Sequence, residues 1–244
     1  MKILLMADQD VGARITQWLI SNYRDDIFLI VTTSKNNISE LAEHSQIAHL
    51  LFESEAQLLS VIDKKDIDLG FLIWWPKIIK KKLISCTNKG FINTHPSFLP
   101  YCRGKHYNFW TLVEESPFGV SLHLVNTGID DGDIISQSRI CYDWEDNGES
   151  LYKKAKAEMI DLFIKTYPKL RSLNIYVQKQ DLTIGSFHLA AEIDEASRID
   201  LDNNYKVREL LNLLRARTFY NHPACYFKDN GNEYEVRVQI TKKK

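Results

Sequence analysis

The sequence lacks several features that would place it in a special class of protein. Its four cysteines are scattered without a CxxC pair, which excludes a recognisable disulfide framework or zinc finger. The 31 basic and 32 acidic side chains give a net charge of -1, so there is no basic field for a nucleic acid. The apolar start, residues 1–6, is too short for a signal peptide or a membrane span. We therefore expect a cytoplasmic protein with free thiols and neither a nucleic-acid nor a membrane partner, while a small anionic ligand stays compatible with this charge.

Short apolar runs alternate with amphipathic segments over the first 75 residues. The runs that predict buried strands are 2–6, 26–33 and 68–74, and helical spacing is clearest at 11–23 and 55–63. Repeated β-α-β units favour a mostly parallel sheet with helices on both faces. Only a lone Gly12 follows the first run, so the GxGxxG fingerprint of dinucleotide-binding proteins is missing.

The second half of the chain predicts further strands, two helices and a C-terminal hairpin. Strands are expected at 119–125 and 134–141, a long helix at 151–170, an irregular linker at 179–197 and a helix at 207–217. A hairpin of 224–227 and 233–240 is expected around 228–231, because Asn-Gly favours the turn. We predict a main α/β domain over residues 1–180 and a small α+β extension over residues 181–244.

An unusual set of polar side chains stands at 93–97, directly after an apolar run. Asn93 and His95 are two residues apart, so in an extended strand both project from the same face. Pro96 biases His95 away from helical backbone angles. Each residue alone is more often a cap or turn residue than a catalytic one, so a functional interpretation requires further groups to converge there.

A carboxylate that could join this pair is Asp130, in a loop bounded by Gly128 and Gly132. A carboxylate beside an imidazole fixes the ring tautomer and helps it accept a proton. An amide donor can stabilise a developing oxyanion. Asn93, His95 and Asp130 together suit acyl transfer to an amine without a covalent enzyme intermediate.

Other interpretations of the same residues stay open at this stage. A metal site from His95, His106, His123 and Asp130 is less favoured, because their spacing is not that of a zinc finger or a helical pair. A serine hydrolase with Ser97 as nucleophile lacks the G-x-S-x-G elbow. His123 lies within a predicted strand and is expected to be a packed or hydrogen-bonded histidine.

Four motifs follow one another in this chain: His95-Pro96-Ser97-Phe98-Leu99-Pro100, Arg103-Gly104 before Trp110, Gly119-Val120-Ser121-Leu122-His123, and Gly128-Ile129-Asp130-Asp131-Gly132. In order and spacing they resemble the formyltransferases that use 10-formyltetrahydrofolate. The resemblance is strong over residues 70–145 and implies the Rossmann-like formyltransferase fold. It also implies that Asn93, His95 and Asp130 are catalytic. His95 would take or relay the amine proton, Asp130 would orient it, and Asn93 would hold the oxyanion with protonated His95.

The C-terminal sequence bears on the acceptor. The chain lacks the larger basic C-terminal domain of methionyl-tRNA formyltransferases, and glycinamide ribonucleotide formyltransferases usually end earlier. Residues 198–201 and 210–227 are similar to the tail of sugar N-formyltransferases, which act on nucleotide-linked amino sugars such as dTDP-4-amino-4,6-dideoxyglucose for O-antigen and lipopolysaccharide biosynthesis. By the same resemblance we expect a homodimer through the C-terminal hairpin. The alternatives are a 10-formyltetrahydrofolate hydrolase and an inactive sugar-nucleotide-binding protein.

The expected ligand contacts follow from this resemblance, and no metal is expected. Folate contacts are Phe71, Ile73, Trp74, Trp75, Asp131 and Gly132, although the family usually has smaller aliphatic residues where the two tryptophans stand. Sugar-nucleotide contacts are Trp75, Lys77, Ser97, Arg103, Gly104, His106, Tyr107, Tyr152, Arg198, Arg215, Phe219 and Tyr220. Arginine could meet a diphosphate and an aromatic ring could stack on a base. Alternatively, Arg215 and Arg217 form a solvated helix end, Phe219 belongs to the core, and Lys77 is a surface lysine.

Overall fold

The computed structural model describes residues 1–173 and 175–243. The chain divides into two compact units. The first unit contains residues 1–95, 121–137 and 159–180, and the second contains residues 96–120, 138–158 and 181–244. The domain boundary expected at residue 180 stays a prediction.

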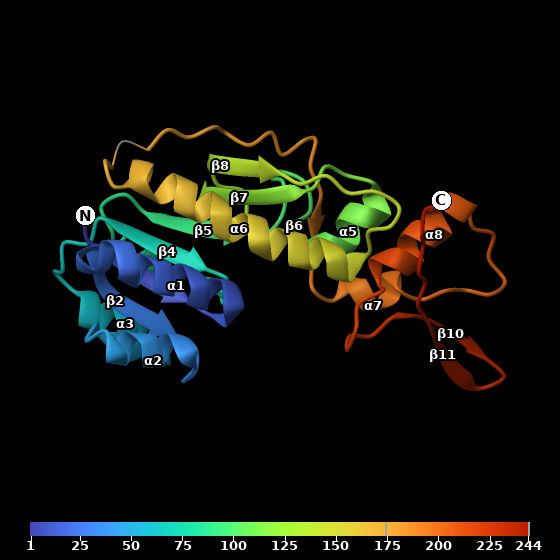
Figure 1. The fold of residues 1–244 in the computed structure, drawn as a ribbon, viewed down its shortest axis with the longest axis horizontal. Coiled ribbons are helices and arrows are strands. Elements are labelled where there is room, and N and C mark those ends of the chain that lie inside the picture. The colour runs from blue at the N-terminus through green and yellow to red at the C-terminus, as the bar shows by residue number, and fades with distance from the viewer. Residues whose placement is uncertain (174, 244) are drawn as a thin grey trace. The chain divides into compact units, whose positions relative to one another are not determined.

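The described residues form one main sheet of seven strands in the order β3-β2-β1-β4-β5-β7-β8 (Figure 1). The pairs β1–β2, β2–β3, β1–β4 and β4–β5 are parallel, whereas β5 and β7 are antiparallel. This confirms the mostly parallel sheet expected from the alternating pattern. The strands are β1 (Ile3–Ala7), β2 (Ile27–Thr32), β3 (His49–Leu51), β4 (Leu69–Ile73), β5 (Phe91–His95), β7 (Gly119–Leu124) and β8 (Ile134–Arg139).

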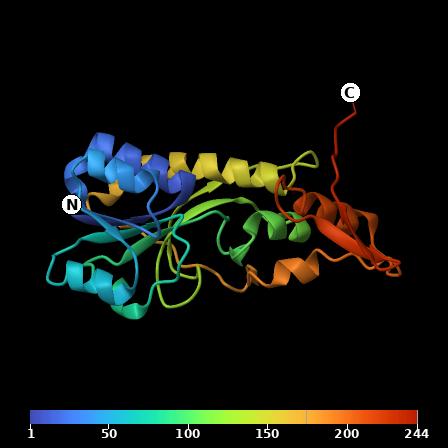
Figure 2. The ribbon, with the colours of Figure 1, turned by 90° about the horizontal axis from the view of Figure 1, so that it is seen from below.

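Helices cover both faces of the sheet in the first unit (Figure 2). The central strand β1 is buried at every position, as its uniformly apolar sequence requires. Leu4 and Met6 point to the face covered by α3 and α4, where they join the apolar core. The opposite face is covered by α1 and the end of α6. The helices around the sheet are α1 (Gln9–Tyr23), α2 (Asn37–His44), α3 (Glu55–Ile62), α4 (Lys81–Ile84) and α6 (Gly148–Leu170).

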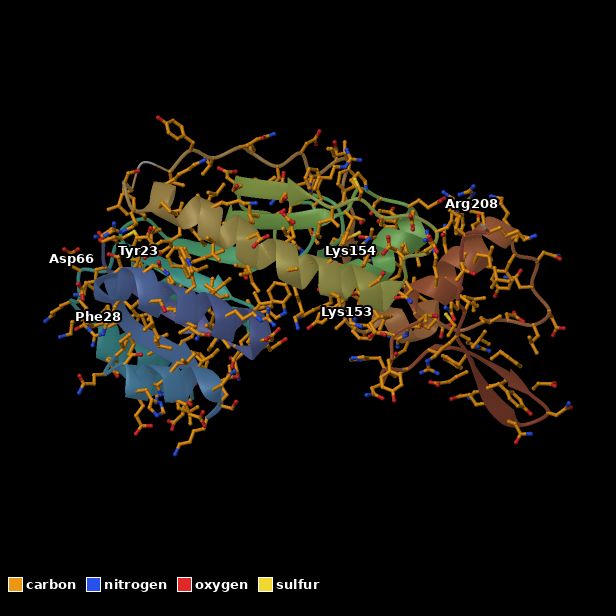
Figure 3. The ribbon with its side chains drawn as sticks, in the orientation of Figure 1. Tyr23, Phe28, Asp66, Lys153, Lys154 and Arg208 are labelled. Atoms are coloured by element: carbon orange, nitrogen blue, oxygen red, sulfur yellow. The ribbon has the colours of Figure 1, made fainter. Side chains whose placement is uncertain are left out.

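A buried carboxylate fixes α6 beside the start of β2. Asp26, the last residue of a short 3-10 turn (Arg24–Asp26), accepts a hydrogen bond from the Tyr167 hydroxyl at 2.9 Å. Arg171 donates to both oxygens of the same carboxylate, at 2.7 and 3.1 Å. The Tyr167 ring also packs on Tyr23, which Figure 3 labels at the end of α1. The buried charge is therefore fully paired, as a buried carboxylate requires.

A capping motif fixes the start of α2, directly after the polar residues that follow β2. Asn36 caps the helix by accepting from the backbone N–H groups of Ile38 and Ser39. The Ser39 hydroxyl in turn accepts from the Asn36 backbone N–H. This reciprocal capping box satisfies the first free amides of the helix, so α2 begins at Asn37.

The second unit contains short elements and a hairpin. The predicted linker carries a two-residue strand and also a five-residue helix that was not expected, since a helix of that length shows no periodicity. The elements are β6 (Arg103–Gly104), α5 (Tyr107–Glu114), β9 (Phe187–His188), α7 (Glu192–Ala196), α8 (Val207–Ala216), β10 (Cys225–Asp229) and β11 (Asn232–Val236). Arg208 of α8, labelled in Figure 3, lies over the Trp144 ring at 5.1 Å.

The C-terminal hairpin is confirmed, with β10 and β11 antiparallel. Asn230 and Gly231 both have positive φ angles, 47° and 79°, as the tight turn predicted for Asn-Gly requires. Separately, among the described residues no helix combines the length and the low polarity that crossing a bilayer would need.

Candidate active site

The polar pair predicted at 93 and 95 lies at the carboxyl end of β5. Asn93 is paired in register with His123 of β7, and His95 is paired with Ser121. The intervening Thr94 faces the other way and donates its hydroxyl to the Leu72 carbonyl at 3.1 Å. The Thr94 hydroxyl also accepts from the Trp74 backbone N–H at 3.0 Å. The end of β5 is thus tied to the end of β4, which holds the two site side chains on rigid backbone.

Asp130 reaches this strand end from the loop 126–133. One carboxylate oxygen, Oδ2, lies 3.3 Å from His95 Nδ1, and His95 is only 4% exposed. The other, Oδ1, accepts from Asn93 Nδ2 at 3.2 Å. The structure therefore brings together the three side chains that the sequence predicted to converge. An acceptor at Nδ1 keeps the hydrogen on that nitrogen in the neutral ring and leaves Nε2 as the base.

His123 completes the cluster. Its Nδ1 lies 2.8 Å from the Leu124 carbonyl, which can only accept, so Nδ1 carries the hydrogen. Neutral His123 can then accept at Nε2 from Asn93 Nδ2, at 3.2 Å. This arrangement fixes which end of the Asn93 amide faces Asp130, because a flipped amide would set its oxygen against the carboxylate. The expectation that His123 is packed and hydrogen-bonded is confirmed.

The loop that carries Asp130 is closely packed and locally strained. Asp130 has a φ of 50°, a region that non-glycine residues seldom adopt. A Cβ atom at Gly132 would overlap the Leu124 carbonyl, and one at Gly128 would overlap the Asp131 carboxylate. Gly132 is therefore required by the close approach of the Leu124 backbone, whereas at Gly128 only the carboxylate end of one side chain stands in the way. Among the described residues, no group of three or more His, Cys, Asp and Glu side chains forms a candidate metal site.

The residues expected to contact folate differ in accessibility. Phe71 and Ile73 are completely buried, and the Phe71 ring packs on Phe163 of α6. Trp74 and Trp75 are half-buried, and Trp74 has a φ of 52°. The Trp75 ring meets Phe52 edge to face at 5.3 Å, and its indole N–H is buried without a hydrogen-bond partner in the described residues. Of these four residues, the two tryptophans thus offer side-chain surface to a ligand.

Three further predicted contacts belong to the first unit. Asp131 is partly buried, while Gly132 is buried. One Asp131 oxygen, Oδ1, is enclosed without a hydrogen-bond partner among the described residues. Lys77 is exposed, with its Nζ 5.8 Å from the Phe52 ring centre. Exposure is also what a surface lysine would show, so both interpretations of Lys77 stay open.

In the second unit, four of the predicted substrate contacts lie at and just before the start of α5. Arg103 and Gly104 form β6, which pairs with β9, and a Cβ atom at Gly104 would overlap the His188 carbonyl. His106 has a φ of 58°, and burial, followed by the charge of Arg217, lowers its pKa. Tyr107 is nearly buried, and burial raises the pKa of its hydroxyl well above the ordinary value. His106 is therefore neutral over a wider pH range than a free histidine.

The aromatic residues of the C-terminal tail form a small cluster. The Phe219 ring lies 5.4 Å from the Tyr152 ring of α6 and 4.3 Å from His222. Tyr220 is 75% exposed, so its ring is free to meet a planar group. Phe219 is half-buried, so it is not the core residue considered as an alternative, and part of its ring is exposed.

The remaining predicted substrate contacts differ strongly in burial. Arg198 is exposed, with its guanidinium 3.9 Å from Glu195. Ser97 is buried at 1% exposure. Arg215 is only 4% exposed and donates to the backbone carbonyls of Asp143 and Asp146. Arg215 is therefore a buried donor that holds two backbone carbonyls, and not the solvated helix end considered from the sequence.

Two residues of the site escaped sequence reasoning. Thr94 could have been found, because it alternates with the catalytic pair on a strand and must face the opposite way. Gln180 could not, because it stands in a segment without periodicity. Its side-chain amide donates to the backbone carbonyls of Asp130 and Gly132.

Comparisons with known proteins agree with this geometry. A family model described as formyl transferase matches residues 5–166, and one described as N-formyltransferase dimerization C-terminal domain matches residues 192–242. The dTDP-4-amino-4,6-dideoxyglucose formyltransferase of Mycobacterium tuberculosis is 27% identical over 154 residues, covering 63% of this chain and 65% of the relative. The match thus spans slightly less than two thirds of that relative's length.

Solved structures are similar over nearly the whole chain. A sugar N-formyltransferase from a Shewanella species has a TM-score of 0.82 at 21% identity and covers 100% of this chain and 99% of its own. The N-formyltransferase from Helicobacter canadensis, in complex with folinic acid and dTDP-3-aminofucose, has a TM-score of 0.74 at 18% identity and covers 95% and 85%. These likenesses confirm the formyltransferase fold. Because the first family model matches more than half of the sequence, the chain belongs to the formyl transferase family.

Proposed function

We propose that this protein is an N-formyltransferase that moves the formyl group of 10-formyltetrahydrofolate to the amino group of a nucleotide-linked amino sugar. The convergence of Asn93, His95 and Asp130 at the end of β5 carries the proposal. The M. tuberculosis relative is named for dTDP-4-amino-4,6-dideoxyglucose, and the H. canadensis structure holds folinic acid and dTDP-3-aminofucose. We take the first of these sugars as the leading acceptor, in a pathway to O-antigen or lipopolysaccharide.

The donor set of the site fits a formyl donor. It offers an imidazole, a carboxylate and an amide within hydrogen-bond reach of one another, which is what proton removal from an attacking amine and charge stabilisation at a carbonyl need. When bound, the folate supplies the activated formyl group. Of the residues expected to contact folate between 71 and 75, Trp74 and Trp75 have side-chain surface to hold it.

His95 is the proposed base of the reaction. Asp130 accepts from Nδ1, so Nε2 carries the lone pair that takes the amine proton. Once His95 is protonated, the carboxylate 3.3 Å away stabilises the imidazolium. The base and its orienting acid therefore stand in the relation that general-base catalysis requires.

Asn93 is the proposed oxyanion donor, and the structure adds a condition to this role. Both hydrogens of its amide nitrogen are directed to neighbours, His123 Nε2 and Asp130 Oδ1, each at 3.2 Å. These distances are at the long end for hydrogen bonds, so both bonds are weak. We propose that one hydrogen turns to the oxyanion when the substrates bind, while the other keeps the amide in place.

The partners of the proposed enzyme are a nucleotide sugar and folate. We further propose a homodimer formed through residues 192–242, which match the dimerization family model. The four free cysteines are consistent with the reducing cytoplasm, where we place the reaction. Neither a nucleic acid nor a membrane is part of the proposal.

The test is to mix the protein with 10-formyltetrahydrofolate and a panel of amino-sugar nucleotides, then to seek formylated product by mass spectrometry. The panel contains dTDP-4-amino-4,6-dideoxyglucose, dTDP-3-aminofucose and a UDP-linked 4-amino sugar. Formylation of one member, abolished by His95→Asn, is expected. No turnover with any member would refute the acceptor class, and formate release that ignores the added sugar would establish a hydrolase instead.

A further inference from the structure

The catalytic carboxylate depends on a loop whose backbone is unfavourable by itself. Asp130 has a φ of 50°, which costs free energy for a non-glycine residue. Its two oxygens must nevertheless reach His95 and Asn93 at 3.3 and 3.2 Å. A shift of the loop by about an ångström would break both contacts, and misplacement on that scale can cost about a hundredfold in rate. Something must therefore hold the loop.

One side of the loop is held by β7. The Leu124 backbone N–H donates to the Asp133 carbonyl at 2.8 Å. Gly132 lies flat against Leu124, leaving no room for a side chain. These contacts fix the returning half of the loop, but they do not touch the backbone of Asp130 itself.

The other side of the loop is held by the buried side chain of Gln180. Its Nε2 donates to the Asp130 carbonyl at 3.0 Å and also to the Gly132 carbonyl. Gln180 is 7% exposed, so these hydrogen bonds are shielded from water. The amide cannot be flipped, because its oxygen would then face two carbonyl oxygens. One amide group thus bridges the residue that carries the carboxylate and the glycine that turns the loop.

Gln180 is itself anchored through its own segment. Two residues earlier, Gln178 exchanges backbone hydrogen bonds with Ile134 at the start of β8, at 2.7 and 2.8 Å. This bridge extends the sheet by one antiparallel pair and sets the position from which Gln180 reaches inward. The Gln178 side chain is exposed, so the anchor is formed by backbone only.

We propose that Gln180 is a positioning residue for the formyl transfer, acting through Asp130. It holds the Asp130 backbone in its left-handed conformation and thereby sets the carboxylate against His95 Nδ1. This proposal rests on the proposed function of the same site. In this role Gln180 touches neither substrate. Its loss should therefore slow the chemical step more than it weakens substrate binding.

The variant that tests it is Gln180→Met, which keeps the length of the side chain and removes both donated hydrogen bonds. With saturating substrates we expect kcat to fall about ten- to a hundredfold, with KM for each substrate changed less than about threefold. Gln178→Met is the matched control, since it is the same substitution on an exposed side chain in the same segment, and it should leave both constants unchanged. An unchanged kcat in Gln180→Met, or an equal loss in both variants, would overturn the proposal.

A second readout needs no substrate. Nitrogen-15 NMR of the His95 ring reports which ring nitrogen carries the hydrogen in the neutral form. In the unaltered protein Asp130 should hold the hydrogen on Nδ1, and Gln180→Met should lose this preference while Gln178→Met keeps it. An unchanged tautomer in Gln180→Met would refute the positioning role.

The two readouts separate the proposals. If the protein formylates no amino sugar but the tautomer still responds to Gln180→Met, the proposed function fails and the positioning role stands. If Gln180→Met does not fold, Gln180→Asn takes its place, because it keeps the amide and withdraws it by one methylene. A normal tautomer and a normal kcat in that variant would overturn the proposal.

Discussion

Asp130→Asn is the sharpest test of the site, because the structure shows why a nearly isosteric change should fail. Both oxygens of Asp130 accept hydrogen bonds, one from His95 Nδ1 at 3.3 Å and one from Asn93 Nδ2 at 3.2 Å. An asparagine has one acceptor and one donor at these positions. If its N–H faces Asn93, that contact becomes donor against donor; if it faces His95, the ring can accept only by carrying its hydrogen on Nε2, which removes the proposed base.

The magnitude follows from the charge that is lost. At 3.3 Å, a carboxylate and an imidazolium attract by about 5 kcal/mol at an effective dielectric constant of about 20. Most of this attraction arises only when His95 is protonated during the reaction, so it stabilises the transition state more than the ground state. We therefore expect kcat to fall by about 10³- to 10⁴-fold, equivalent to about 4 to 5.5 kcal/mol.

The assay is the initial rate of formyl transfer with both substrates saturating, together with KM for each. Asp133→Asn is the matched control, since it makes the same change three residues away in the same loop, where only the backbone carbonyl is engaged by Leu124. The control should stay within about threefold of the unaltered rate, as surface substitutions usually do. If Asp130→Asn also stays within threefold, the carboxylate does not orient the base and the assigned role is wrong.

Three further outcomes follow from buried groups. Tyr167→Phe should lower the free energy of unfolding by about 1.5 to 3 kcal/mol in urea denaturation, because it deletes a buried hydrogen bond to a carboxylate. Tyr23→Phe should cost far less, and equal losses would contradict this account. Arg215→Met should destabilise the protein by several kcal/mol, as two carbonyls lose a buried donor. Burial raises the pKa of the Cys102 thiol to about 11, so at about pH 8 iodoacetamide should modify exposed Cys141 first, as peptide mass spectrometry would show.

The cluster of Asn93, His95 and Asp130 could be predicted from sequence because the signals for it are local. Asn93 and His95 share a strand, so period-two alternation alone sets them on one face. Asp130 was identified through the glycines at 128 and 132 that bound its loop, and at Gly132 the structure shows a close approach to the Leu124 backbone. The parallel sheet followed from equally local apolar runs, and the Asn-Gly turn from the dihedral angles that these residues accept.

The ligand contacts depend on tertiary burial, which no local pattern reports. Arg215 has the sequence context of an exposed helix end, yet the carbonyls of Asp143 and Asp146, about 70 residues away in the chain, enclose it. Phe71 is an aromatic residue on an apolar strand, and only the packing of α6 shows that its ring is closed to a ligand. No sequence pattern marked Gln180. Its side chain donates to backbone carbonyls, which every residue has, so the neighbouring sequence does not reveal the contact.

The change from parallel to antiparallel pairing at β5 explains how one short loop can complete the site. Because β7 runs antiparallel to β5, Leu124 at the end of β7 is paired with Ile92, one residue before Asn93. The loop that follows therefore begins opposite Ile92 and returns about three residue spacings along the sheet to set Asp130 beside His95. Gly132 permits that return because it has no side chain to overlap the Leu124 carbonyl. The Gln180 side chain then donates a hydrogen bond to the Gly132 carbonyl. Because β7 runs away from the carboxyl end of β5, the loop after β7 must turn back along the sheet before Asp130 can reach His95.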